Sequence, residues 1–222
     1  MENRNSFGNR TARRTRPVTY AALAVALVVS LPLSAHAAHV TPPPVPGTIV
    51  IEEGNRAFLE GHATGTQNYV CLPSGTGFAW SLFTPQATLF NDHDRQITTH
   101  FFSPNPAEKG NPIRAAWQHS RDTSTVWGQI TGQSVDPAFV APGAIPWLRV
   151  EKVGVLHGPS GGETLTVTTF IHRVNTVGGV APATGCSVAT DVGKRAFVPY
   201  TADYFFYTNR DTDDDLTDDG CN

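Results

Sequence analysis

The feature that most constrains the fold is a succession of short β-like runs between residues 48 and 207. Gly, Pro, Asn and Asp separate the runs, and no stretch there has the apolar spacing of an amphipathic helix. Alternation is clearest in residues 163–174 and 196–207. Their expected apolar faces are Leu165, Val167, Thr169 and Ile171, and Val198, Tyr200, Ala202, Tyr204 and Phe206. This pattern predicts an all-β fold, a single-domain antiparallel β-sandwich or β-barrel.

Turn-forming residues set the expected strand ends. Residues 48–51 have the composition of a first short strand. Gly and Pro then predict breaks that divide the next part of the chain into four short strands, at 56–63, 66–72, 78–83 and 86–91. Pro199 lacks a backbone donor, which predicts that its strand starts late or lies at a sheet edge.

Residues 113–130 have the pattern of a β-hairpin with two tryptophans. If the turn centres on Asp122, Trp117 lies opposite Trp127 and His119 opposite Thr125. All four would then share one face of the sheet. We therefore expect a wall of two tryptophans with a histidine beside it.

The two ends of the chain differ from the β region. Residues 1–37 combine a basic start, a 13-residue apolar run at 21–33 and a small-x-small site ending at Ala37, as in a secretory signal peptide. A Pro-rich leader (38–47), the β domain (48–207) and an acidic flexible tail (208–222) follow. We expect export to the periplasm or outside the cell, and no membrane span in the mature chain. The sequence has no basic stripe, so we expect no nucleic-acid partner.

Four motifs in the β region resemble those of a known family. They are GTQNYVC (65–71), IPWL (145–148), RVNTVGGVAPATGC (173–186) and VPYTADYFFY (198–207). In this order they are similar to a secreted bacterial and fungal family built on one domain of unknown function. The resemblance implies a secreted β-rich domain, and it implies no established activity.

Some fungal members of that family are labelled malate dehydrogenase, but the glycines of residues 173–186 do not support this activity. A dinucleotide fingerprint needs G-x-G-x-x-G between a strand and a helix. Here Gly178 and Gly179 are adjacent, Pro182 interrupts, and no helical period follows. We expect a turn in which the two glycines adopt positive φ, and no cofactor.

The three cysteines allow one disulfide bond in an exported chain. Cys71 and Cys186 each adjoin a predicted strand, whereas Cys221 lies in the polar tail. We therefore predict a Cys71–Cys186 bond with Cys221 unpaired. The alternative is Cys186–Cys221.

The acidic tail contains the only metal candidate. Asp211, Asp213, Asp215 and Asp219 have spacing that resembles one calcium repeat of the thrombospondin type 3 kind. The usual glycine positions hold Asp214 and Leu216 instead. We expect weak or no calcium affinity, and no bound metal.

No catalytic motif stands out, so a site must assemble from separate strands. The candidate pocket residues are His100, Trp117, His119, Trp127, Arg173 and Asp203. His172 alternates with threonines, and we expect it at the surface. The favoured function is non-catalytic binding of a small molecule or glycan, because the scaffold is aromatic and carries no recognised catalytic pattern. The alternatives are a structural or cell-surface protein without a pocket, and an enzyme of unknown reaction. That enzyme would use His100, His119, Asp122, Arg173 or Asp203, for instance as an Arg173–Asp203 pair.

Overall fold

The computed structural model describes residues 40–209, and these residues form an eight-stranded closed β-barrel. The expected signal segment (1–37), Cys221 and the calcium candidates Asp211, Asp213, Asp215 and Asp219 lie outside the described residues. The strands are β1 (Asn55–Ser74), β2 (Gly77–Phe90), β3 (Gln96–Pro104), β4 (Ile113–His119), β5 (Thr125–Ser134), β6 (Trp147–Leu156), β7 (Phe170–Gly178) and β8 (Arg195–Asn209). The only helical elements in residues 40–209 are the short 3₁₀ turns η1 (Gly47–Ile49) and η2 (Ala189–Asp191). The all-β prediction is thus confirmed.

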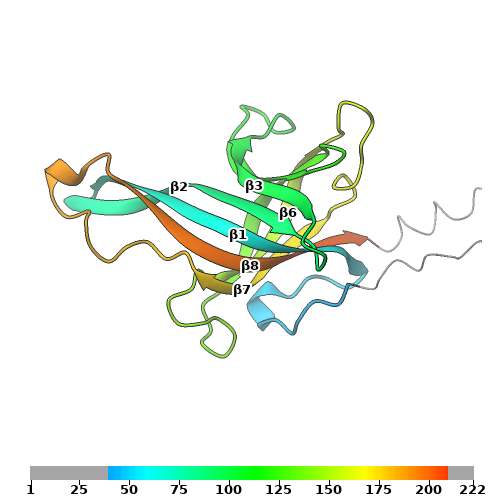
Figure 1. Cartoon of the computed structure of the whole chain (residues 1–222), viewed down its shortest axis with the longest axis horizontal. Coiled ribbons are helices and arrows are strands. Elements are labelled where there is room, and N and C mark those ends of the chain that lie inside the picture. The colour runs from blue at the N-terminus through cyan, green and yellow to red at the C-terminus, as the bar shows by residue number, and fades with distance from the viewer. Residues whose placement is uncertain (1–39, 210–222) are drawn as a thin grey trace, which may run out of the picture. The chain divides into compact units, whose positions relative to one another are not determined.

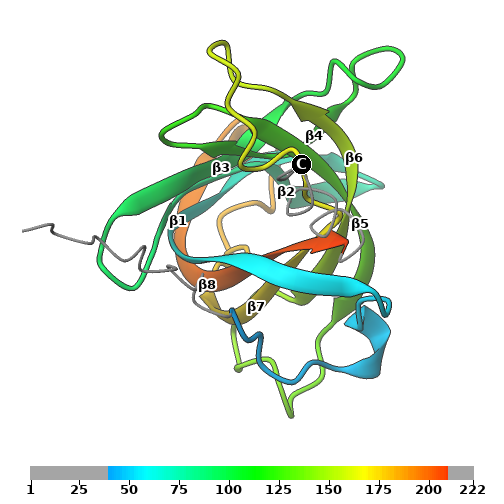
Figure 2. The same cartoon turned by 90° about the vertical axis from the view of Figure 1, so that its right-hand side faces the viewer.

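Each strand pairs antiparallel with the next one along the chain, and β8 returns to pair with β1 (Figures 1 and 2). Figure 2 shows the resulting ring of strands. Of the two architectures left open by the sequence, the fold is therefore the barrel. Within residues 40–209 no helix has the length and apolar character needed to cross a membrane.

The interior of the barrel is the main apolar core. On β8 the alternating residues Tyr200, Ala202, Tyr204 and Phe206 are all buried, as the period of two predicts. Leu165 comes from the β6–β7 connection and packs into the same core without forming part of a strand. Each large side chain buried in this way stabilises the fold by about 1.5–3 kcal/mol.

A second apolar layer lies on the outside of the barrel. It consists of Ile49, Val140, Trp147, Val174, Phe205 and Tyr207, and Val40, Val45 and Phe139 pack against it. The N-terminal segment and the β5–β6 connection thus cover this side, which explains why both faces of β8 are apolar near its end. His172 belongs here too: it is 2% exposed and bonds to the Ile49 carbonyl and the Tyr207 hydroxyl. The surface position expected for His172 is wrong.

Three strands project beyond the barrel as an arm, which we define as residues 66–85 and 195–199 (Figure 1). In the arm β1 pairs with β2 and β8, whereas β2 meets β3 only from Gln86 and β8 meets β7 only from Tyr200. Pro199 therefore has a strand partner only in β1, as expected at a sheet edge, while on the other side its carbonyl accepts a bond from Gly179, the residue after β7.

The expected breaks at Gly65 and Pro85 do not occur, because β1 and β2 each run through as one strand. Gly65 is required for a different reason. A Cβ atom there would lie 2.1 Å from the Gln86 carbonyl oxygen and 2.5 Å from the Ala87 Cα atom. Glycine in a strand permits this close approach of two backbones.

Three further sequence expectations need correction. Residues 48–51 include a 3₁₀ turn, not a strand, and the strand expected at 163–174 begins only at Phe170. The hairpin at 113–130 forms, but its register differs by one residue. Trp117 pairs with Val126, and Trp127 pairs with Ala116. A shift of one residue turns a side chain to the opposite face, so the two tryptophans do not form a common wall.

Candidate functional site

A cavity of about 220 Å³ lies inside the barrel, towards the end that carries the arm. Every strand contributes to its wall, since the lining residues are Gln67, Tyr69, Leu82, Pro85, His100, Phe102, Ala115, Trp117, Ile130, Gln133, Ile145, Pro146, Leu148, Val150, Arg173 and Tyr204. Leu82 and Ile130 are 42% and 54% exposed, so they mark the mouth of the cavity. The lining is mostly apolar, which is typical of a ligand-binding site.

Three stacked or tilted rings form the inner wall. The His100 and Trp117 rings stack with centroids 4.3 Å apart, and Tyr204 lies 5.4 Å from His100 and 5.8 Å from Trp117. All three side chains are at most 4% exposed. Because β3, β4 and β8 hold these rings in close contact, the wall is part of the packed barrel core.

His100 is neutral at physiological pH. Burial lowers its pKa to about 3, although its hydrogen bond to the Ala116 carbonyl favours the charged form. In the neutral ring Nδ1 donates to that carbonyl, 2.9 Å away, and Nε2 keeps its lone pair. His100 is therefore a polar wall residue here and not a cation.

Arg173 of β7 supplies the charge of the cavity. Its Nη2 atom donates to the Pro146 carbonyl at 2.9 Å, which ties the guanidinium to the residue just before β6. Among residues 40–209, no carboxylate lies at ion-pair distance from it. No Asp or Glu lines the cavity either. The cavity is therefore positively charged.

Three buried N–H groups of the lining have no hydrogen-bond partner in the described chain. They are Nε2 of Gln67, Nε1 of Trp117 and Nε of Arg173. Gln67 lies beside the Tyr200 hydroxyl, yet its amide nitrogen makes no bond of ordinary geometry. Buried polar groups are nearly always paired, so these three side chains are exceptions among the lining residues.

The structure brings together three of the six residues selected from the sequence. His100, Trp117 and Arg173 line the cavity. The other three, His119, Trp127 and Asp203, do not. Trp127 lies on the outer side, where its Nε1 atom donates to the Ser103 hydroxyl at 2.8 Å.

His119 and Asp122 form a hydrogen-bonded pair in the β4–β5 turn, 2.9 Å apart. The Asp122 carboxylate also accepts bonds from Ser124 and Thr164. Partial burial disfavours its charge, but these bonds outweigh that effect and hold the pKa of Asp122 well below its ordinary value. The pair thus fastens the turn to the β6–β7 connection, away from the cavity.

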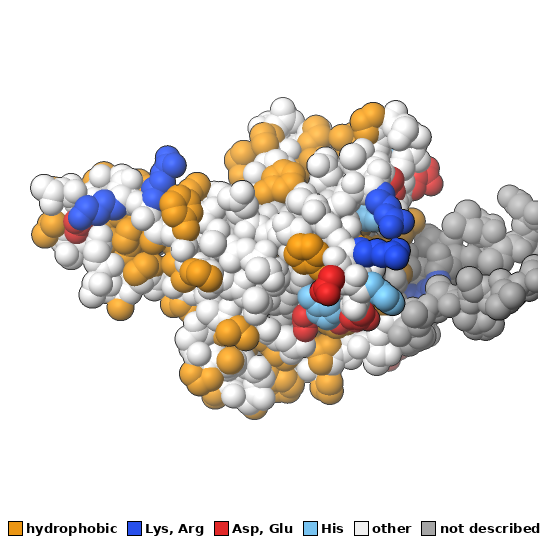
Figure 3. Space-filling view, in the orientation of Figure 1, with side chains coloured by type: hydrophobic (Ala, Val, Ile, Leu, Met, Phe, Trp, Pro, Cys, Tyr) orange, Lys and Arg blue, Asp and Glu red, His pale blue; other side chains and the backbone are white. Residues whose placement is uncertain are grey.

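Asp203 does not pair with Arg173, because the two side chains lie on opposite faces of the sheet. Asp203 instead belongs to an outer group that we call the His62 cluster: Glu60, His62, Asp92, Asn175 and Asp203. His62 lies between two carboxylates, with Nδ1 2.7 Å from Asp203 and Nε2 2.8 Å from Asp92. Figure 3 shows histidine and acidic side chains gathered on this face.

The His62 cluster is the group in the described chain that could in principle hold a metal ion. Ligand atoms of Glu60, His62 and Asp203 all lie within 4.8 Å of one another. Both ring nitrogens of His62 are already bonded to carboxylates, however, so an ion would have to break one of these bonds. The hydrogen bonds that the His62 ring donates to Asp203 and Asp92 raise its pKa to about 8. The geometry fits a protonated histidine held by two carboxylates.

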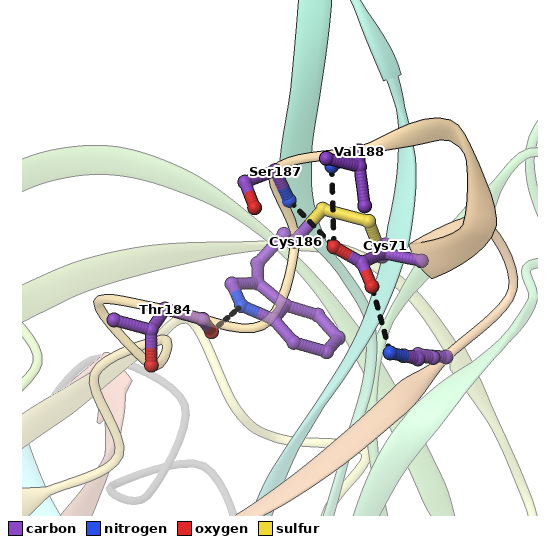
Figure 4. The surroundings of a disulfide bond; sticks show 8 residues. Cys71, Thr184, Cys186, Ser187 and Val188 are labelled. Atoms are coloured by element: carbon purple, nitrogen blue, oxygen red, sulfur yellow. Dashed lines mark hydrogen bonds and ion pairs between the residues drawn. A yellow bond between two sulfur atoms is a disulfide. The ribbon is translucent and has the colours of Figure 1, made fainter.

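The predicted disulfide bond between Cys71 and Cys186 is confirmed (Figure 4). It joins β1 in the arm to the β7–β8 connection across 115 residues. Cys71 also exchanges backbone bonds with this connection, through Gly193 and Lys194. The Trp80 indole donates to the Thr184 carbonyl at 3.0 Å. The connection is therefore fixed along most of its length.

Asp191 anchors the same connection. Its carboxylate pairs with Lys194 at 2.7 Å and accepts bonds from the backbone N–H groups of Ser187 and Val188 (Figure 4). Lys194 and these donors lower the pKa of Asp191 to about 2. Gly178 and Gly179 both have positive φ, and no α-helix follows them within residues 180–209. The glycine-rich stretch is thus a braced loop and not a dinucleotide fingerprint.

Sequence reasoning missed Gln67, Tyr69 and Tyr204 as lining residues. Tyr69 bonds through its hydroxyl to the Gly179 carbonyl at 2.6 Å and so fixes the loop beside the mouth. The available signal was the alternation of Gln67 and Tyr69 with the inward residues Ala63 and Gly65 that precede them in the same strand. A glutamine at an inward strand position is unusual unless it has a partner.

Fold and site together define a class: an antiparallel β-barrel with an internal cavity lined by every strand. The family model described as "Protein of unknown function (DUF3455)" matches residues 52–208, and the chain belongs to this family. This confirms the resemblance to a family built on one domain of unknown function. No curated protein and no solved structure matches the chain significantly.

Proposed function

We propose that this protein is an exported, non-catalytic binding protein that takes one small molecule into the barrel cavity. The observation that carries the proposal is the cavity itself, with its preformed wall of His100, Trp117 and Tyr204. Small-molecule sites are typically concave, apolar and provided with a few polar groups. The Cys71–Cys186 bond supports export, because such bonds persist in oxidising compartments.

The size of the cavity favours a small molecule over a glycan. A dry cavity of about 150 Å³ accepts benzene, and drug-sized ligands occupy about 300 Å³ or more. At about 220 Å³ the space suits a ligand with one ring and a short substituent. A sugar chain would need a longer and more polar groove.

The arrangement of titratable groups favours binding over catalysis. Acid–base catalysis needs two groups within hydrogen-bond reach of one reacting atom. In the cavity His100 is neutral and bonded to backbone, and the guanidinium of Arg173 donates hydrogen bonds but has no acceptor atom for a proton. The His119–Asp122 pair serves a turn outside the cavity.

Thermal-shift and calorimetric measurements on the full chain test the proposal with toluene, indole, benzoate and glucose as probes. We expect at least one ring compound to raise the unfolding temperature and glucose to have no effect. The variant Ala115→Leu places three extra carbons on the cavity wall and should abolish binding. Ala183→Leu, in the exposed part of the β7–β8 connection, is the matched control. Unchanged binding by Ala115→Leu, or no binding of any ring compound by the wild type, would reject the proposal.

A further inference from the structure

The partly buried guanidinium of Arg173, whose Nε atom is fully buried, narrows the kind of ligand, if the cavity is a binding site as proposed above. A charge held away from water is costly unless a counter-charge or hydrogen bonds compensate it. Arg173 has the Pro146 carbonyl as backbone acceptor and the Tyr204 hydroxyl as a polar neighbour, but it has no carboxylate partner in residues 40–209. Its Nε–H group remains without a partner. A negative group on a ligand would supply what the protein does not.

The three unpaired N–H groups of the lining residues are all hydrogen-bond donors. Gln67 Nε2 and Trp117 Nε1 belong to side chains that are 2% and 1% exposed, and both atoms are donors. Together with Arg173 they provide three unpaired N–H groups, and no carboxylate lines the cavity. A carboxylate has two oxygens with about four acceptor positions, which suits several donors at once.

The positive charge reaches much of the cavity wall. Burial raises the pKa of Tyr69, Tyr200 and Tyr204, and in each case the charge of Arg173 opposes this rise. The same charge adds to burial in lowering the pKa of His100. Arg173 therefore favours negative charge on groups contributed by β1, β3 and β8.

We propose that the cavity binds a single-ring carboxylate. Its ring lies against Trp117 and Tyr204, and its carboxylate faces Arg173 with Gln67 and Trp117 as further donors. This inference rests on the proposed binding function and adds the charge and class of the ligand. The apolar wall accounts for the ring, and the unpaired donors account for the anion.

Calorimetry with four probes separates the parts of the inference: benzoate, its neutral counterpart benzamide, toluene, and acetate as an anion without a ring. Benzoate should bind at least about tenfold more tightly than benzamide, because a hydrogen bond to a charged group contributes more than a neutral one. Acetate should bind far more weakly than benzoate, since it leaves the aromatic wall uncovered.

The variant Arg173→Met removes the charge and keeps much of the side-chain length. It should reduce the preference for benzoate over benzamide at least about tenfold, while toluene still binds. Arg195→Met is the matched control, since Arg195 is exposed in the arm and its guanidinium lies over the Phe83 ring. Circular dichroism verifies that both variants fold, and the comparison of probes on the wild type stands without them.

The possible outcomes test the carboxylate, the ring and the binding function separately. Equal binding of benzoate and benzamide, or an unchanged preference in Arg173→Met, overturns the carboxylate ligand and leaves the binding function intact. Acetate that binds as tightly as benzoate overturns the requirement for a ring. No binding of any ring compound overturns the binding function and the inference together.

Discussion

The ring of His100 lies flat on the ring of Trp117, with centroids 4.3 Å and planes 10° apart, and the two side chains are only 4% and 1% exposed. A histidine in this position has a measurable effect on acid stability. Burial lowers its pKa to about 3 in the folded state, whereas an unfolded histidine titrates near 6.5. The unfolded chain therefore takes up the proton first as the pH falls.

We predict that His100 makes the fold less stable at pH 5 than at pH 7. The contribution of neutral His100 to the free energy of unfolding is complete above pH 6.5 and decreases as the pH falls from there towards 3. The loss between pH 7 and 5 should be about 2 kcal/mol. Urea unfolding of the wild type and of His100→Asn, which keeps a donor for the Ala116 carbonyl, measures it. An equally steep pH dependence in His100→Asn would contradict the prediction.

Trp117 and Trp127 should respond differently to a ligand. Trp117 lines the cavity, whereas Trp127 lies on the outer side with its indole bonded to Ser103. A ring compound that binds should change the fluorescence of the wild type and of Trp127→Phe, but not that of Trp117→Phe. Loss of the response in Trp127→Phe instead would mean that the ligand binds outside the barrel.

The His62 cluster should stabilise the fold only below alkaline pH. Hydrogen bonds that His62 donates to Asp203 and Asp92 raise its pKa to about 8. Its contribution to the stability of the fold is therefore complete below pH 6.5 and is lost as the pH rises through 8. His62 is 43% exposed, and screening by solvent limits the contribution to about 1 kcal/mol or less. NMR titration of the His62 ring should show this raised pKa and a clear decrease in Asp203→Asn. An unchanged pKa in that variant would contradict the assignment.

Reduction of the Cys71–Cys186 bond should destabilise the fold strongly. Opening a loop across 115 residues removes about 4–5 kcal/mol in the chain-entropy model. Urea unfolding with and without reductant measures the loss. Peptide mapping of the non-reduced protein should yield the Cys71–Cys186 pair with Cys221 free to be alkylated. A linked peptide that contains Cys221 would contradict the prediction that this cysteine, which lies outside the described residues, is unpaired.

Gly65 should tolerate no side chain. The variant Gly65→Ala places a Cβ atom against the β2 backbone and should cost about 1–3 kcal/mol of unfolding free energy. Gly77→Ala is the matched control, because Gly77 also lies in a strand and a Cβ atom there meets nothing within 4 Å. Equal unfolding midpoints for the two variants would show that the backbones can separate at little cost.

Alternation made parts of this fold predictable. The inward face of β8 follows from the sequence, because Tyr200, Ala202, Tyr204 and Phe206 alternate with residues of a different environment. The hairpin register does not follow, because it depends on the conformation of its turn. Thr123 adopts a positive φ of 58°, and His119 closes the turn with Ser124. No propensity rule predicts a threonine in that conformation.

The candidate site was predictable only in part for a similar reason. His100, Trp117 and Arg173 could be selected as aromatic or charged residues in strands, but the face on which each lies depends on register. Asp203 differs by one position from the inward residue Tyr204, and this places it in the His62 cluster on the outer side. The sequence also predicted a strand in a segment where side chains, and not a neighbouring strand, form hydrogen bonds with the backbone. Asp122 binds the Thr164 backbone and so replaces the strand expected there with turns.

The pairing of β1 with β8 also governs how the barrel can form. Seven of the eight strand pairs join neighbours in the chain, but the eighth joins Asn55 to Asn209 and is among the most extensive. Such distant pairing is slow, because the entropy of a long loop is lost before any contact forms. Until β8 arrives, β1 and β7 expose unpaired edges that can associate with other chains. Closure of the ring is therefore the step at which folding and aggregation compete.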